Sequence, residues 1–251
     1  MEKNSLDATE NIEKDSEIKV RAFNLEKVHD LFTDSLKESE DIYLSAYLEA
    51  YKELNKFFVL MGSMFSFVSS EIDTKVAILE KLIEASHLET STNGAREQVE
   101  NNMNGSVVHD PSNPFESINS MIDYERSNDL LTKKDYVSGS RTLLRLHRGL
   151  DFIRVFLRDL SQLQSTVCVA QCCKQAYDRT LSKYHSWFIR KAVNLATYTM
   201  PTQRQLLNKV CGSDVEIQNT LQLLPTMLEV TDEVYNRTQS IFEISNLLNL
   251  G

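Results

Sequence analysis

The chain has 251 residues, a formal net charge of −9 at pH 7 and a hydrophobic fraction of 41%. The acidic balance argues against a nucleic-acid-binding protein, because a phosphate backbone requires a basic surface, and the apolar fraction suffices for a substantial core. With only 7 glycines and 4 prolines, a loop-rich β architecture is also disfavoured.

The beginning of the chain shows no secretory signal. Residues 1–21 are charged, lack the apolar segment of such a signal, and are expected to form a disordered acidic tail. The longest apolar stretch, Phe57 to Val68, is too short to span a bilayer and is interrupted by glycine and serine. We therefore expect a cytosolic protein.

From residue 23 onward, apolar residues recur at helical spacing, and no segment shows sustained alternation with a period of two. The pattern predicts three helices before the first long loop, at about residues 23–36, 43–58 and 64–86. An aromatic stripe runs along the second of them and consists of Tyr43, Tyr47, Tyr51 and Phe58. Such a stripe is typical either of a core or of the wall of an apolar cavity, and the sequence does not separate the two.

Residues 88–114 differ from the rest, since they are rich in asparagine and serine and contain two prolines. We expect a mobile insertion within one domain of residues 22–251 rather than a linker between two domains. The reason is that the helices before the insertion would leave their apolar faces uncovered if they folded alone.

The second half of the chain predicts further helices, and the expected fold class is all-α. A helix that Pro225 interrupts is expected to start at Ser213, and another to continue it from about Thr226. His185 and Trp187, the only tryptophan, fall at a helix junction. The other helices are expected at about residues 115–131, 141–163 and 166–184, with a short one after Pro201.

Three arginines are conspicuous because they follow one stripe of the predicted helix at 141–163. Arg141, Arg145 and Arg148 have i, i+4, i+7 spacing, and leucines fill the other faces. The segment 138–140 offers an N-cap, which places Arg141 in the first turn, where the helix dipole disfavours a cation. Solvated surface arginines explain this pattern, but arginines at a helix N-terminus can also hold a phosphate. Both interpretations stay open on these residues alone.

Motifs for catalysis and for metal or cofactor binding are missing from the sequence. There is no glycine-rich phosphate loop, no GxSxG and no HExxH, and no clear nucleophile accompanies the 5 histidines. The cysteines fit no zinc spacing and are expected to act as small hydrophobic residues; they are Cys168, Cys172, Cys173 and Cys211. We therefore expect neither an enzyme nor a bound metal or cofactor.

Several ordered segments together resemble the glycolipid transfer protein family, most closely its ceramide-1-phosphate transfer branch. The resemblance runs from about Tyr43 to Leu250. Its specific parts are MGSMFSFVSSEIDTKVAILEKL, SGSRTLLRLHRGLDFIRVFL and AYDRTLSKYHSWFIRKAV, followed by the turn Met200-Pro201-Thr202. The resemblance implies an all-α, two-layer helical sandwich that encloses an apolar lipid pocket with a polar headgroup site at its mouth.

The resemblance also implies roles for individual residues. The acidic residue at position 71 accepts hydrogen bonds from the sphingoid amide and hydroxyl, and His185 donates to the acyl carbonyl. Position 75 and the helix with Arg141 and Arg145 meet the headgroup. The sugar-binding branch has asparagine and a stacking tryptophan where this chain has Lys75 and Arg145, which suit a phosphate instead.

Two positions are less directly defined by the resemblance. The family typically has aspartate where this chain has Glu71, so the longer carboxylate either still reaches the lipid amide or turns to Lys75. A further basic group is expected in the loop before the arginine helix, supplied by Lys134 or by Lys133. Trp187 fits a membrane-docking anchor or, alternatively, a core residue at a helix junction.

The function expected from these residues is transfer of ceramide-1-phosphate or a related sphingolipid by a monomer that contacts membranes transiently. Nucleic acid is not an expected partner. One alternative is a lipid-sensing adaptor that uses the same pocket and signals through the tail or the insertion. Another is neutral glycosphingolipid transfer, which the basic residues at positions 75 and 145 disfavour. A phosphatase-like enzyme is a further alternative, and no motif demands it.

Overall fold

The computed structural model describes residues 23–62, 65–93 and 113–250. The tail expected at residues 1–21 and most of the insertion expected at 88–114 lie outside the described residues. The described chain forms nine α-helices and one short 3-10 helix: α2 (Leu25–Ser35), α3 (Leu44–Met61), α4 (Ser66–Asn93), α5 (Ile118–Ser127), α6 (Gly139–Ser161), α7 (Ala170–Arg179), η2 (Ser182–Tyr184), α8 (Trp187–Thr197), α9 (Gln203–Cys211) and α10 (Asp214–Ile244).

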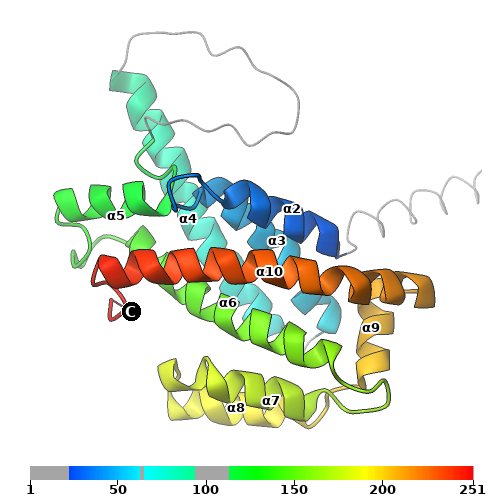
Figure 1. The fold of residues 1–251 in the computed structure, drawn as a ribbon. Coiled ribbons are helices and arrows are strands. Elements are labelled where there is room, and N and C mark those ends of the chain that lie inside the picture. The colour runs from blue at the N-terminus through cyan, green and yellow to red at the C-terminus, as the bar shows by residue number, and fades with distance from the viewer. Residues whose placement is uncertain (1–22, 63–64, 94–112, 251) are drawn as a thin grey trace, which may run out of the picture.

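The helices pack in two layers. In Figure 1, α2, α10 and α6 lie one beside the next across the front, α3 and α4 cross behind them, and α7 and α8 lie below α6. Only isolated bridges and no strands occur within residues 23–62, 65–93 and 113–250. The predicted all-α sandwich is thus confirmed. None of the described helices is both long and apolar enough to cross a membrane.

Apolar side chains from both layers form the core. Ring contacts link α2 and α3, since Phe32 lies 6.0 Å from Tyr47 and 6.4 Å from Tyr51 between ring centroids. The Tyr51 hydroxyl donates to the backbone carbonyl of Leu146 on α6 at 2.6 Å. The largest fully buried side chains include Phe32, Tyr47, Tyr51, Phe58, Phe156 and Phe242. The aromatic stripe of α3 is therefore chiefly a core feature.

The predicted interruption at Pro225 is wrong, because α10 continues through it from Asp214 to Ile244. Proline inside a helix removes one backbone hydrogen bond and usually kinks or ends the helix. Buried side chains on either side of it, Leu224, Met227 and Leu228, keep both halves of the helix on the core. The helix expected at 166–184 is also shorter, since α7 covers only Ala170–Arg179.

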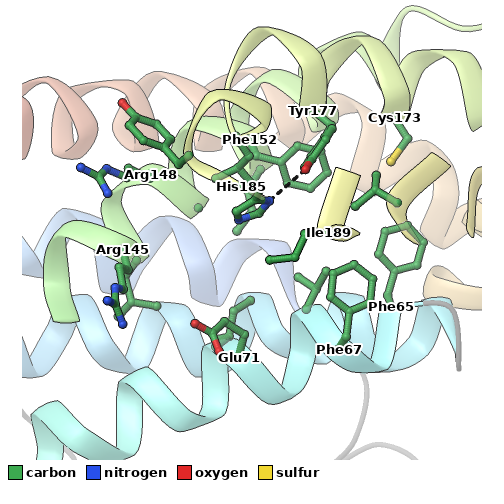
Figure 2. A pocket seen from close by; sticks show the side chains of 18 of the residues that line it. Phe65, Phe67, Glu71, Arg145, Arg148, Phe152, Cys173, Tyr177, His185 and Ile189 are labelled. Carbon is green, nitrogen blue, oxygen red and sulfur yellow. Dashed lines mark hydrogen bonds between the residues drawn. The ribbon is translucent and has the colours of Figure 1, made fainter. Parts of the chain in front are cut away.

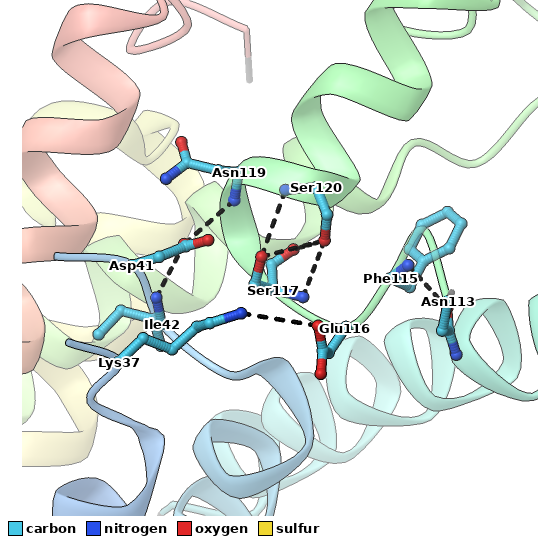
Figure 3. A network of polar contacts seen from close by, with 9 residues as sticks. All are labelled: Lys37, Asp41, Ile42, Asn113, Phe115, Glu116, Ser117, Asn119 and Ser120. Carbon is cyan, nitrogen blue, oxygen red and sulfur yellow. Dashed lines mark hydrogen bonds and ion pairs between the residues drawn. The ribbon is translucent and has the colours of Figure 1, made fainter. Parts of the chain in front are cut away.

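A polar junction fixes α5 against the turn between α2 and α3 (Figure 3). The Asp41 carboxylate accepts from the backbone N–H groups of Ile42 at 2.8 Å and Asn119 at 3.2 Å. Ser117 caps α5 in a reciprocal arrangement with Ser120, which satisfies amides that the first helical turn leaves unpaired. These bonds determine where α5 starts and therefore where its last turn lies.

Hydrogen bonds connect the last turn of α5 to the first turn of α6. Glu125 is fully buried, and its carboxylate accepts from the Ser138 hydroxyl at 2.8 Å and from the N–H groups of Gly139 at 2.5 Å and Ser140 at 3.1 Å. Ser138 is the N-cap of α6, as expected. The helix N-terminus therefore already carries a carboxylate of the protein itself, and these amides are not open to an external phosphate.

Candidate functional site

A cavity of about 880 Å³ opens between α4, α6, α7 and α8. Its two ends differ, as Figure 2 shows: Arg145 and Arg148 lie at one end, while Phe65, Phe67 and Cys173 lie at the other. Tyr51, the stripe residue of α3 that faces α6, also lines the wall. A cavity that is charged at one end and apolar at the other matches an amphiphilic ligand.

Four of the expected headgroup residues meet at this cavity: Glu71 and Lys75 from α4, Arg145 from α6 and His185 from the turn before α8. A carboxylate oxygen of Glu71 lies 2.8 Å from the Lys75 ammonium nitrogen. The Lys75 side chain is nearly buried, whereas that of Glu71 is 63% exposed. In this structure Glu71 therefore turns to Lys75, which is one of the two orientations that its longer side chain allows.

Arg145 differs from Lys75 and Arg148 at the same cavity. It is exposed, lines the charged end, and forms no hydrogen bond or ion pair with any residue in the described part of the chain. Arg148 donates to the carbonyl of Leu248 at 2.8 Å and stacks on the Tyr184 ring at 4.0 Å. The guanidinium of Arg145 is thus the one whose donors need no rearrangement to meet an anion.

His185 lies in the middle of the cavity wall next to Tyr177, as Figure 2 shows. The Tyr177 hydroxyl and His185 Nδ1 share a hydrogen bond of 2.9 Å. Burial lowers the pKa of His185, and the Glu71 carboxylate partly opposes this effect. The imidazole is therefore neutral at pH 7, and one ring nitrogen is engaged by tyrosine.

Arg141 and the two lysines before it are not part of the cavity wall. Arg141 donates through Nε to the carbonyl of Leu250 at 2.9 Å and through Nη2 to that of Leu131 at 3.0 Å. Lys133 and Lys134 are exposed in the loop before α6 and do not line the cavity. Of the expected phosphate contacts, the structure therefore gathers Lys75 and Arg145 but leaves Arg141 turned to the C-terminal segment.

Sequence reasoning missed several residues at the same cavity. Arg148 belongs to the arginine stripe, but its place on the wall depends on how α6 is rotated by packing. Lys183 and Tyr184 precede His185, and the Lys183 ammonium lies 4.9 Å from the centre of the Tyr184 ring. No spacing in the sequence distinguishes Lys183 from other surface lysines. Together the wall carries four cationic side chains and one carboxylate.

Helix α8 begins directly after His185 and carries an exposed apolar face. Trp187 is 57% exposed and Phe188 78% exposed, and their rings contact each other at 5.1 Å between centroids. The Lys191 ammonium lies 5.5 Å from the centre of the Trp187 ring. Trp187 is thus not a core residue, and an exposed aromatic pair with basic neighbours is typical of an interfacial surface.

The remaining side chains near the site bear on its chemistry. Burial raises the pKa of the Cys172 and Cys173 thiols to about 12, so both are protonated at neutral pH. A protonated thiol is a poor nucleophile and a poor metal ligand.

An all-helical sandwich around a cavity with an apolar interior and a cationic mouth is the architecture of a protein that holds a lipid by its chains and its headgroup. The chain belongs to the glycolipid transfer protein family, whose family model (Glycolipid transfer protein, GLTP) matches residues 42–212.

Ceramide-1-phosphate transfer proteins of vertebrates are among its relatives. The zebrafish protein is 32% identical over 233 residues, which cover 91% of this chain and 98% of the relative. The structure of the mouse protein in its apo form superposes with a TM-score of 0.75 at 28% identity, covering 91% of this chain and 100% of that one. The human protein in complex with 12:0 ceramide-1-phosphate gives a TM-score of 0.72 at 28% identity, with 92% and 100% covered.

Proposed function

We propose that this protein transfers ceramide-1-phosphate between membranes, with the phosphate held by an arginine and lysine cluster and both chains buried in the apolar cavity. The observation that carries the proposal is Arg145, which stands unpaired among the described residues at the charged end of a cavity whose other end is apolar. A phosphomonoester has about −1.5 to −2 charges and three acceptor oxygens, which match guanidinium and ammonium donors. A sugar headgroup needs an aromatic platform instead.

The headgroup site in this proposal consists of Glu71, Lys75, Arg145 and His185, with Arg141 as a further ligand. Tyr177 donating to His185 Nδ1 would keep the imidazole proton on Nε2, which can then donate to the acyl carbonyl. Glu71 accepts from the lipid amide once the phosphate takes over Lys75. The change at Glu71 replaces its contact with Lys75 by a contact with the ligand, whereas the bond between Tyr177 and His185 is kept.

Arg141 joins the phosphate by exchanging partners. Its present acceptors are two backbone carbonyls, and a phosphate oxygen forms a stronger, charge-assisted bond with a guanidinium. Release from Leu250 and Leu131 is therefore part of binding in this proposal. Lys134 remains a candidate for an additional contact, and its exposed position leaves it free to approach.

A carrier rather than an enzyme follows from the energetics of the cargo. Two chains with on the order of 30 methylenes lose roughly 0.8 kcal/mol per methylene when they are exposed to water, so the free lipid is negligible in solution. Burial in the cavity offsets this loss, and the lipid moves down its own gradient without chemical change. We propose that the protein acts as a monomer in the cytosol and contacts membranes transiently through Trp187 and its neighbours on α8.

The experiment that tests this function is transfer between vesicles. Purified protein should move ceramide-1-phosphate with a fluorescent acyl chain from donor to acceptor vesicles, and should move fluorescent galactosylceramide far more slowly. Mass spectrometry after prolonged incubation should recover the lipid unchanged. Equal or faster transfer of galactosylceramide would contradict the headgroup assignment, and a dephosphorylated product would contradict the carrier.

A further inference from the structure

Gly149 lies in the middle of α6, where glycine weakens a helix because it has the largest conformational freedom to lose. The other glycines in the described part of the chain have local reasons. Gly62 and Gly212 end helices with φ of +96° and +88°. A Cβ on Gly139 would lie 2.7 Å from the Met121 sulfur, so the contact with α5 requires glycine there.

None of these reasons applies to Gly149. Its backbone is that of an ordinary helix, and a Cβ built on it would meet no atom within 4 Å. Packing within the protein therefore neither excludes a side chain at this position nor gains from its absence. Contacts within the protein therefore do not explain the glycine, and a bound molecule does.

The position of Gly149 on α6 indicates that this molecule is the ligand of the cavity. The residues of α6 that line the cavity form one face, and Gly149 stands at its centre, one turn after Arg145 and one turn before Ile153. Leu146 and Phe152 flank it on either side. The space that a side chain would occupy is therefore space within the cavity.

Along the helix, Gly149 also marks the change from charged to apolar wall. Arg145 and Arg148 precede it, and the lining residues of α6 after it are Phe152 and Ile153. A lipid that lies with its phosphate at the arginines and its chains along the aromatic wall passes Gly149 with the branched part between headgroup and chains. This part is the widest of the molecule, since both chains and the amide start there.

We propose that Gly149 is a specificity-determining residue, whose missing side chain lets the branch point of a two-chain lipid lie directly against the backbone of α6. The inference rests on the proposed function, because it uses the same lipid orientation. Glycine makes α6 less stable at this position but leaves space for the ligand. A methyl group there would displace the lipid, and a larger side chain would close the cavity at its branch level.

The test compares Gly149→Ala and Gly149→Leu with the unchanged protein and with Ala77→Leu, a control that adds volume at an exposed position of α4 outside the cavity wall. Gly149→Ala should unfold at the same temperature or about 1 to 4 °C higher, because alanine favours the helix. Its transfer of fluorescent ceramide-1-phosphate should nevertheless fall about tenfold, the effect of one misplaced methyl group. Gly149→Leu should lose transfer entirely and Ala77→Leu should keep it.

A second readout separates this inference from the proposed function. Native mass spectrometry of protein purified from cells reports the lipid that it carries, whatever the headgroup. Gly149→Leu should carry no lipid, whereas the original protein should carry one. The circular dichroism spectra of the two proteins should be the same. If both carry the same lipid to the same extent, the inference is overturned, even if ceramide-1-phosphate is transferred. If the unchanged protein carries a different lipid that Gly149→Leu lacks, the inference stands and the proposed headgroup fails.

Discussion

Arg145 and Arg158 lie on the same helix and carry the same group, yet their surroundings differ. Arg158 is paired with Asp232 at 2.5 Å and lies away from the cavity, whereas Arg145 lines the cavity without a partner in the described residues. An arginine that an ion pair already satisfies has fewer donors available for a ligand. The role of each arginine is thus decided by its neighbours rather than by its residue type.

The first prediction follows from this difference. Arg145→Leu should lower ceramide-1-phosphate transfer about 10- to 100-fold, since a hydrogen bond to a charged group contributes roughly 1.5 to 3 kcal/mol. Arg158→Leu is the matched control and should leave transfer within about twofold. Vesicle assays with a fluorescent acyl chain measure both variants. Similar loss in the two variants would mean that the effect is structural rather than at the headgroup.

His147, two residues after Arg145, points to the other side of α6. It is buried, stacks on the Tyr235 ring at 4.4 Å between centroids, and shares a hydrogen bond of 2.7 Å with the Gln239 side chain. Burial lowers its pKa to about 4, although the bond with Gln239 acts in the opposite direction. His147 is therefore a core residue that is neutral at pH 7.

The second prediction concerns pH. The folded-state pKa of His147 lies below the unfolded value, so on acidification the unfolded chain takes up this proton first. The contribution is constant above about pH 6.5, and the free energy of unfolding should decrease by on the order of 3 kcal/mol between about pH 6.5 and 4. His147→Phe, which keeps the ring stacking, should flatten this dependence in urea titrations. An unchanged slope would show that other groups dominate acid unfolding.

At the scale of elements, α5 acts as a support for α6. Its start is fixed by Asp41, and its last turn presents Glu125 to the first turn of α6. The buried carboxylate of Glu125 thus orients α6. It also occupies the N-terminus of this helix, where the sequence alone allowed a bound phosphate. Glu125 occupies the first amides of α6, and the proposed phosphate site uses side chains of this helix instead.

The third prediction is that Glu125→Ala destabilises the protein by on the order of 3 kcal/mol, because it leaves three buried donors without an acceptor. Glu125→Gln keeps the shape and one acceptor oxygen and should lose less. Glu229→Ala, at an exposed position of α10, is the control and should be near neutral. Urea unfolding followed by circular dichroism gives these free energies, and a neutral Glu125→Ala would rule out the proposed support.

The C-terminal segment after α10 is a second element that reaches the site. Arginines at three positions donate to its carbonyls: Arg126 to Ser245, Arg148 to Leu248 and Arg141 to Leu250. Two of these arginines belong to the stripe of α6. The segment thus occupies guanidinium donors of α6, including those of Arg141, which the proposed headgroup site would use.

For the whole molecule, the apolar face of α8 contrasts with the acidic charge of the chain. Exposed aromatic and aliphatic residues gather on α8 and just beyond it: Trp187, Phe188, Leu195 and Tyr198. Trp187 and Phe188 follow directly after the turn that carries His185, so a membrane bound by this face would lie close to the cavity. Lipid would then enter from the bilayer without crossing water.

The fourth prediction is that the double substitution Trp187→Ala and Phe188→Ala lowers vesicle binding and transfer by at least tenfold, since each large apolar side chain contributes roughly 1.5 to 3 kcal/mol on burial. Lipid already bound should be retained, because neither residue lines the cavity. Val215→Ala with Ile244→Ala, also exposed, is the control. Vesicle sedimentation and native mass spectrometry separate docking from lipid binding, and loss of bound lipid would contradict the docking role.

The sequence alone predicted the all-α fold, the helix with the arginine stripe and an N-cap for this helix within residues 138–140. These features depend on periodicity and on contacts three or four residues apart, which are local. The continuity of α10 through Pro225 was not accessible in this way, because it depends on side chains that are buried against distant helices.

Which side chains share the cavity depends on how distant helices pack. The rotation of α6 about its axis is set by its packing against α4, α5, α7 and α10 and by the carboxylate of Glu125. This rotation turns Arg145 and Gly149 to the cavity, His147 to the core and Arg141 to the C-terminal carbonyls. A stripe in the sequence defines which residues can act together, but the packing of distant elements selects those that meet the ligand.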